Sequence, residues 1–241
     1  MKSADASCCK YSPGTRGFVI LRRLQFRNST SELTGSYKST SALNSIDIDT
    51  GKVKVMRLTP EGSYGEGLVH IGDKLIQLTY KEKKIFIYDY KSFALLKTLP
   101  YSTSKEGWGI SESSEGLVVS DGSSNLFIID KSSFQTKRII SVRSGQTTID
   151  QLNQLQVVDD VVYANVFTTN YILKIRLSDG CILSYADMSP LLEQFSNEDR
   201  EYISSDNNFV LNGIAYNPST KNFFVTGKNW SKIFEVRFQG D

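Results

Sequence analysis

The chain has 241 residues, of which 39% are hydrophobic and 22% charged, an ordinary composition for a globular protein. Its formal net charge of +2 provides no basic surface of the kind that nucleic acids bind, so we expect no nucleic-acid partner. No apolar run approaches the roughly 20 residues of a membrane-spanning helix, so we expect no membrane partner. The single histidine, His70, excludes a zinc site built from several histidines.

The first part of the chain shows only a weak strand pattern. Residues 1–17 have no regular alternation and predict an irregular segment, which leaves 18–241 as the folded domain. Phe18–Leu24 is mostly apolar, and Ala42–Asp47 alternates towards a turn before a short strand at Lys52–Leu58. We interpret these segments as a first, less regular group of strands.

From Gly65 onward, short β-forming runs separated by turns recur with a regular spacing. A helix is predicted only at Ser189–Ile203, with Ser189 as its cap and Pro190 in its first turn. The predicted strands form four groups: Gly65–His70, Lys74–Thr79, Ile85–Asp89 and Ala94–Leu99; Gly107–Ser111, Gly116–Ser120, Asn125–Asp130 and Thr136–Val142; Leu152–Val157, Val161–Phe167, Tyr171–Leu177 and Cys181–Asp187; Leu211–Tyr216, Asn222–Gly227 and Lys232–Phe238.

The four regular groups begin with a distinctive residue at Glu66, Trp108, Asn153 and Asn212. Four-stranded units that repeat about every 40–50 residues are typical of a β-propeller, whose blades bury their faces only against one another, and the predicted helix lengthens the last interval. With the first group included, the sequence predicts an all-β, five-bladed β-propeller. The last group has three strands, and only the poorly β-forming Lys2–Tyr11 remains to complete it, so we expect the chain to begin late, with a closing strand upstream.

Several segments of these groups resemble the plant and bacterial type of glutaminyl-peptide cyclotransferase. The resemblance covers roughly Thr34 to Phe238. The matching segments are Tyr64-Gly65-Glu66-Gly67-Leu68, Glu106-Gly107-Trp108-Gly109, Ser120-Asp121-Gly122-Ser123, Leu152-Asn153, Tyr163-Ala164-Asn165-Val166, Leu211-Asn212-Gly213-Ile214-Ala215 and Phe224-Val225-Thr226-Gly227-Lys228. The resemblance implies a five-bladed propeller that converts an N-terminal glutamine to pyroglutamate with release of ammonia, without a catalytic metal or cofactor. The implied partners are peptides or proteins with N-terminal glutamine, and we expect a monomer.

The resemblance also implies roles for six residues. Glu66 matches the family's acid/base glutamate, which takes a proton from the attacking amine and returns it to the departing ammonia. Lys228 and Asn153 match the catalytic lysine, which would stabilise the developing oxyanion, and the asparagine that would orient the substrate amide. Three aromatic residues are expected to wall the substrate pocket: Trp108, Tyr80 and Phe167.

Structural interpretations of these residues remain open beside the catalytic one. A glutamate between two glycines is often a solvated turn residue, and a tryptophan is often part of the core. For Asn165, Asp121 and Asn212 we favour structural roles at strand ends.

The sequence departs from the family pattern at its start. Counting back from Thr34-Gly35 places Phe18-Val19-Ile20-Leu21-Arg22 where the family has a channel-facing Phe-Thr-Gln-Gly-Leu segment. This loss favours an alternative in which the propeller is catalytically inactive and binds peptides or proteins as a scaffold. A metal-dependent, lactonase-like propeller is a third hypothesis, and the resemblance argues against it.

Two sequons, Asn28-Ser29-Thr30 and Asn229-Trp230-Ser231, and the resemblance itself favour the secretory pathway or an extracellular location. Met1–Gly17 has no apolar core of the kind that a signal peptide contains.

Overall fold

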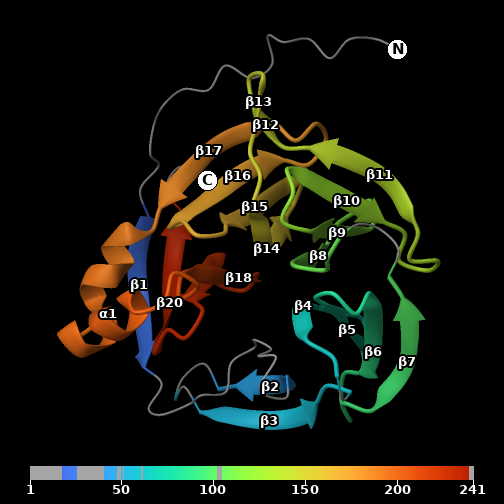
Figure 1. Cartoon of the computed structure of the whole chain (residues 1–241), viewed down its shortest axis with the longest axis horizontal. Helices are drawn as coiled ribbons and strands as arrows, with labels where there is room; N and C mark the ends of the chain where they lie inside the picture. Colours follow the sequence, from blue (N-terminus) through green and yellow to red (C-terminus); the bar gives the residue numbers. More distant parts are fainter. Residues whose placement is uncertain are drawn as a thin grey trace.

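Strands arranged around a common centre dominate the computed structural model, which describes residues 18–25, 41–47, 50, 52–60, 62–101 and 105–238 (Figure 1). Within these residues the strands form four antiparallel sheets of four strands and two sheets of two strands. The all-β, propeller-like architecture predicted from the repeats is therefore confirmed. No helix in the described ranges is long and apolar enough to cross a membrane.

Each four-stranded sheet is a blade, and we name each blade after its innermost strand. In Figure 1 the strands β4, β8, β14 and β18 lie nearest the centre. The β4 blade contains β4 (Gly65–Ile71), β5 (Lys74–Thr79), β6 (Lys84–Asp89) and β7 (Leu95–Pro100); the β8 blade contains β8 (Ile110–Glu112), β9 (Leu117–Ser120), β10 (Asn125–Ile129) and β11 (Thr136–Ser141); the β14 blade contains β14 (Leu152–Val158), β15 (Val161–Val166), β16 (Tyr171–Arg176) and β17 (Ile182–Asp187); the β18 blade contains β18 (Leu211–Asn217), β19 (Asn222–Gly227), β20 (Lys232–Phe238) and β1 (Phe18–Gln25).

The β18 blade joins the first described strand to the last one. Strand β1 pairs antiparallel with β20, from Phe18 opposite Phe238 to Gln25 opposite Lys232. Two predictions are wrong here: the 18–22 segment is not the channel-facing start of a first blade, and the strand that completes the last group is β1 rather than a strand upstream of Met1. The segment Lys2–Tyr11 lies outside the described residues. The physical reason is that β20 would otherwise present an unpaired edge, and the strongly β-forming β1 satisfies its backbone groups.

A two-stranded sheet lies between the β18 blade and the β4 blade (Figure 1). It consists of β2 (Ala42–Ile46) and β3 (Val53–Leu58). Ser41, just before β2, accepts a 2.8 Å hydrogen bond from Thr59 N through its carbonyl, and its hydroxyl accepts a 3.0 Å bond from Gly65 N at the start of β4. The predicted first group of strands is thus divided, since its Phe18–Leu24 strand belongs to the β18 blade. A second small hairpin, β12 (Arg143–Ser144) and β13 (Thr147–Thr148), extends beyond β11.

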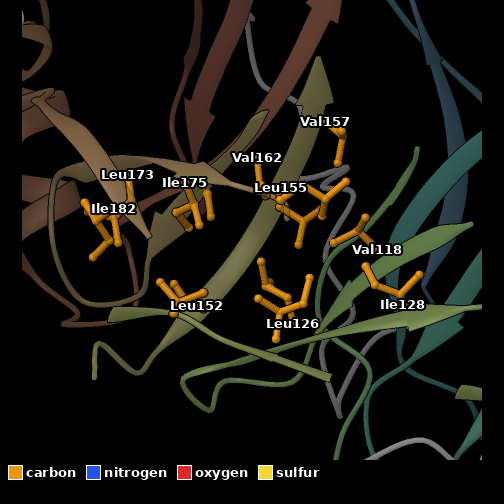
Figure 2. Packing of buried hydrophobic residues seen from close by; sticks show 14 residues of the cluster. Val118, Leu126, Ile128, Leu152, Leu155, Val157, Val162, Leu173, Ile175 and Ile182 are labelled. Carbon is orange, nitrogen blue, oxygen red and sulfur yellow. The ribbon is translucent and has the colours of Figure 1, made fainter. Parts of the chain in front are cut away.

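Apolar layers between neighbouring blades hold the ring together. Between the β8 and β14 blades, Val118, Leu126, Leu152 and Ile175 are at most 1% exposed and belong to one cluster (Figure 2). Similar clusters join the β4 blade to the β8 blade and the β14 blade to the β18 blade. Because the β8 and β14 blades bury both of their faces in this way, the four innermost strands are held in position relative to one another.

The connection between β17 and β18 contains two short helices instead of the single helix predicted at Ser189–Ile203. A 3₁₀ helix, η2, covers Ser189–Gln194, and an α-helix, α1, covers Asn197–Ser204. The hydroxyl of Ser196 accepts a 3.1 Å bond from Asp199 N and caps α1, whereas the cap position of η2 is Met188, without a side-chain hydrogen bond. The predicted cap was therefore placed one helix too early.

Candidate active site

The innermost strands of three blades carry a β-bulge at the same place. In β4 the strand register shifts between Gly65 and Leu68, and equivalent shifts follow Leu152 in β14 and Leu211 in β18. The first residues within these shifts are Glu66, Asn153 and Asn212. A bulge inserts an extra residue, bends the strand and redirects a side chain, and bulges are common beside active sites. Three of the four distinctive residues at the heads of the sequence repeats therefore occupy equivalent positions.

A second set of equivalent positions lies next to the bulges. The residue before each bulge pairs with a residue at the end of the second strand of the same blade. These paired residues are Thr79, Val166 and Gly227. The residues that follow these partners are Tyr80, Phe167 and Lys228. Each of the three blades thus contributes one residue from its bulge and one residue from the end of its second strand.

In the β8 blade, Trp108 lies just before the innermost strand and connects three blades. Its backbone N–H donates to Ser120 O at 3.1 Å within its own blade. Its carbonyl oxygen accepts from Gly67 N of the β4 blade at 2.7 Å and from Gln154 Nε2 of the β14 blade at 3.4 Å. These bonds fix the backbone of Trp108 between its two neighbours.

The glycines of the Gly-Glu-Gly and Gly-Trp-Gly motifs allow this close approach. A Cβ at Gly67 would lie 2.6 Å from Trp108 O, and a Cβ at Gly109 would lie 2.4 Å from Asn153 O. Both distances are shorter than real Cβ contacts, and both obstacles are backbone atoms. The glycines therefore have a packing function: they bring neighbouring innermost strands together around the centre.

Trp108, Phe167 and Lys228 form a continuous group across three blades. The ring centroids of Trp108 and Phe167 are 5.6 Å apart in an edge-to-face arrangement. The Lys228 Nζ lies 5.0 Å from the centroid of the Phe167 ring, within the range of a cation–π interaction. Gly122 leaves room for the indole, since a Cβ there would lie 2.6 Å from the Trp108 ring.

Two charged side chains, Lys81 and Glu106, connect the ring of Tyr80 to that of Trp108. The Tyr80 ring lies 5.6 Å from that of Tyr64 and 4.8 Å from the Lys81 Nζ. Lys81 lies 3.7 Å from a carboxylate oxygen of Glu106. The other oxygen of Glu106 accepts a 2.9 Å hydrogen bond from Trp108 Nε1. The indole N–H is therefore already engaged, and its orientation is set by Glu106.

The electrostatic environment of Glu66 differs from that of a surface glutamate. Burial raises the pKa of Glu66 from its ordinary value of 4.5 to about 7. The positive charge of Lys228 acts in the opposite direction, and the negative charges of Glu106 and Glu82 add smaller increases. Glu66 and Lys228, which are far apart in the sequence, thus lie close enough for the charge of one to act on the other.

Asn153 is 4% exposed and is held from its backbone. Its carbonyl oxygen accepts a 2.6 Å bond from the Ser120 hydroxyl of the neighbouring blade. Its side-chain Oδ1 is buried and has no hydrogen-bond partner within the described part of the chain. A buried acceptor without a partner is uncommon in folded proteins and is suited to accept an N–H from a ligand.

Glu106 and Glu82 are two residues at this site that the sequence did not indicate. Glu106 orients Trp108, and Glu82 has a buried carboxylate oxygen, Oε2, without a hydrogen-bond partner among the described residues. Each lies two residues from an aromatic residue that was predicted to line the pocket, Glu106 from Trp108 and Glu82 from Tyr80. This short separation was the sign in the sequence that they contribute to the site. No group of three or more metal-ligating side chains occurs in the ranges that the structure describes.

The sequence profile of one family, described as glutamine cyclotransferase, matches residues 17–238. The chain belongs to the glutamine cyclotransferase family. The resemblance seen in the sequence motifs is thereby confirmed.

Two members of this family illustrate the similarity. The chain is 30% identical over 208 residues to glutaminyl-peptide cyclotransferase of Arabidopsis thaliana; the match covers 86% of this chain and 63% of that protein. The chain thus spans less than two thirds of the length of its Arabidopsis relative. The crystal structure of Myxococcus xanthus glutaminyl cyclase superposes with a TM-score of 0.76 and 26% identity, and the match covers 94% of this chain and 98% of that one.

Proposed function

We propose that this protein is a glutaminyl-peptide cyclotransferase, which converts the N-terminal glutamine of peptides or proteins to pyroglutamate and releases ammonia. Membership of the glutamine cyclotransferase family supports this proposal. The observation that carries it is the position of Glu66, which lies on a bulge of an innermost strand within the influence of Lys228 and has a pKa near 7.

In the proposed reaction, the α-amine nitrogen of the substrate attacks the carbonyl carbon of its own γ-carboxamide. A carbon–nitrogen bond forms to close a five-membered ring, and the bond to the carboxamide nitrogen breaks. Glu66 takes the proton that the amine loses and delivers it to the departing ammonia. A carboxyl group with a pKa of about 7 is suited to both steps at neutral pH, and general acid–base catalysis of this kind contributes about 10²–10⁴-fold.

The other residues bind and orient the substrate in this proposal. Lys228, held over the Phe167 ring, stabilises the negative charge that develops on the carboxamide oxygen. The buried Oδ1 of Asn153 accepts an N–H of the substrate. The rings of Trp108, Phe167 and Tyr80 form the walls that exclude water.

The proposed mechanism assigns every step to side chains of this chain and uses no metal ion. We therefore expect turnover to persist in the presence of a chelator, whereas a metal-dependent, lactonase-like propeller would lose its activity.

We also propose that β2 and β3 are the outer strands of a fifth blade. They lie in the ring between the β18 blade and the β4 blade (Figure 1), and Leu43 of β2 belongs to the same apolar cluster as Leu75 and Phe86 of the β4 blade. The superposition on 98% of the Myxococcus glutaminyl cyclase chain supports a complete ring.

The deciding experiment measures ammonia release from a dipeptide with N-terminal glutamine. The Glu66→Gln variant keeps the shape of the side chain but loses its proton transfer, and we expect its turnover to fall at least about 10²-fold. The exposed Glu193→Gln is the matched control and should retain full activity. Equal turnover by Glu66→Gln and the parent would refute the role of Glu66.

A parent protein that binds the dipeptide without releasing ammonia would refute the enzymatic proposal. That result would support the alternative, in which the propeller is a catalytically inactive peptide-binding scaffold.

A further inference from the structure

Asn212 occupies the position in the β18 blade that Glu66 and Asn153 occupy in theirs. It is the first residue within the register shift of the innermost strand. Its Oδ1 is buried and has no hydrogen-bond partner among the residues that the structure describes. Asn153 has the same combination of a bulge position and a buried amide oxygen without a partner. The two asparagines lie on β14 and β18, which contact each other as neighbouring innermost strands.

The backbone at Asn212 is held in place from both sides. The Gly213 N–H donates a 3.0 Å hydrogen bond to Oδ1 of Asn165, a fully buried side chain of the β14 blade. Gly213 has a φ of +149°, and a Cβ there would lie 2.8 Å from the Thr226 side chain, so glycine is required at this position. The bulge that carries Asn212 is therefore a fixed feature.

Asn212 is also the neighbour of Lys228 within its own blade. The ladder pairs Leu211 with Gly227, and the Lys228 N–H donates to Val210 O at 2.9 Å. Asn212 and Lys228 thus lie on either side of the Leu211–Gly227 pair, at diagonal positions on two paired strands. One of them provides a hydrogen-bond acceptor, and the other provides a positive charge with N–H donors.

We propose that Asn212 is a substrate-binding residue whose Oδ1 accepts a hydrogen bond from the NH₂ of the substrate's γ-carboxamide. This inference rests on the proposed cyclotransferase function. A primary carboxamide presents one oxygen and two N–H donors side by side, which matches Lys228 on one side and amide oxygens on the other. Asn212, for which the sequence favoured a structural role, therefore joins the residues that bind the substrate.

This arrangement also selects the leaving group. As the carbon–nitrogen bond breaks, the departing nitrogen takes up a proton, and acceptors around it stabilise the N–H bonds that it forms. A γ-carboxylate in the same position has no N–H to donate, so the amide oxygens would be left without partners, which is costly in a buried site. Asn212 thus favours glutamine over glutamate at the N-terminus.

Two substrates that differ only in the leaving group test this inference. One is a dipeptide with N-terminal glutamine; the other carries N-terminal glutamic acid γ-methyl ester. In both, the α-amine attacks the same carbon and the same ring forms. The amide releases ammonia, whereas the ester releases methanol and has no N–H at the leaving group.

For Asn212→Ala we expect kcat/KM to fall about 10-fold or more with the amide, the equivalent of one buried hydrogen bond. With the ester, after subtraction of the spontaneous reaction, kcat/KM should stay within about twofold of the parent, because the ester makes no bond to Asn212. The exposed Asn197→Ala is the matched control and should change neither value. Asn212→Ser is the second variant if the alanine variant does not fold.

An equal loss with both substrates would overturn the inference. It would mean that Asn212 supports the fold, for example by pairing with the buried Nδ2 of Asn165, which also has no partner within the described residues. A parent protein that turns over neither substrate would instead refute the proposed function itself, so the two failures are distinguishable.

Discussion

Replacing Glu66 by glutamine should stabilise the fold at alkaline pH while removing catalysis. In the unfolded chain the carboxyl ionises with a pKa near 4.5, but in the folded protein this pKa is about 7. The folded state therefore holds the proton more tightly, and its stability decreases as the pH rises from 4.5 to 7. Glutamine resembles the protonated carboxyl and does not experience this loss.

The size of the effect follows from the difference between the two pKa values. Each pKa unit is worth about 1.4 kcal/mol. The free energy of unfolding of Glu66→Gln should therefore exceed that of the parent by about 3 kcal/mol at pH 8.5 and by only about 1 kcal/mol at pH 5. For a chain of this size, about 3 kcal/mol corresponds to a rise in Tm of about 6–12 °C.

Urea denaturation of both proteins at pH 5 and at pH 8.5 measures this difference, with Glu193→Gln as the surface control. The control should show no change at either pH. If Glu66→Gln raised the free energy of unfolding equally at the two pH values, or did not raise it at pH 8.5, the conclusion that burial raises the pKa of Glu66 would be refuted.

Two further predictions concern the same site. Lys228 lowers the pKa of Glu66, and Glu106 raises it. The acidic limb of the pH profile of kcat/KM should therefore move to higher pH in Lys228→Met and to lower pH in Glu106→Gln. Identical acidic limbs in the two variants would contradict this account. Lys221→Met, at an exposed position, is the control for the lysine. Gly67→Ala should lower the free energy of unfolding by about 1–3 kcal/mol, because its Cβ would meet the backbone of Trp108. The exposed Ser114→Ala is its control in urea denaturation, and a Gly67→Ala protein of parental stability would show that the neighbouring strands move apart at little cost.

The blades were predictable because their signals are local. Alternating apolar residues and turn residues mark each strand, and the heads of the repeats at Glu66, Trp108 and Asn153 mark where the innermost strands begin. The pairing of β1 with β20 was not predictable, since it joins segments from opposite ends of the sequence. Counting back from Thr34 assumed that the chain enters the ring at an innermost strand, whereas the structure places Phe18–Gln25 at the outer edge of the β18 blade.

In the candidate site, too, some features were predictable from the sequence and others were not. The sequence motifs indicated the residues themselves, but not why they come together: the bulges at Glu66, Asn153 and Asn212 depend on the register between paired strands. The influence of Glu82 and Glu106 on Glu66 depends on distances across the β4 and β8 blades, which no local pattern encodes.

The pairing of β1 with β20 has a consequence for how the protein is made. The β4, β8 and β14 blades each consist of consecutive strands and can form while the ribosome is still adding residues, but the β18 blade waits for Phe238 before its outer strand can dock. Until then, both β1 and the growing end of the ring carry backbone groups without partners. Contacts between such distant segments form slowly, and exposed strand edges recruit other chains during the delay. Newly synthesised molecules are therefore most prone to aggregate in the interval between the completion of the β14 blade and the docking of β1.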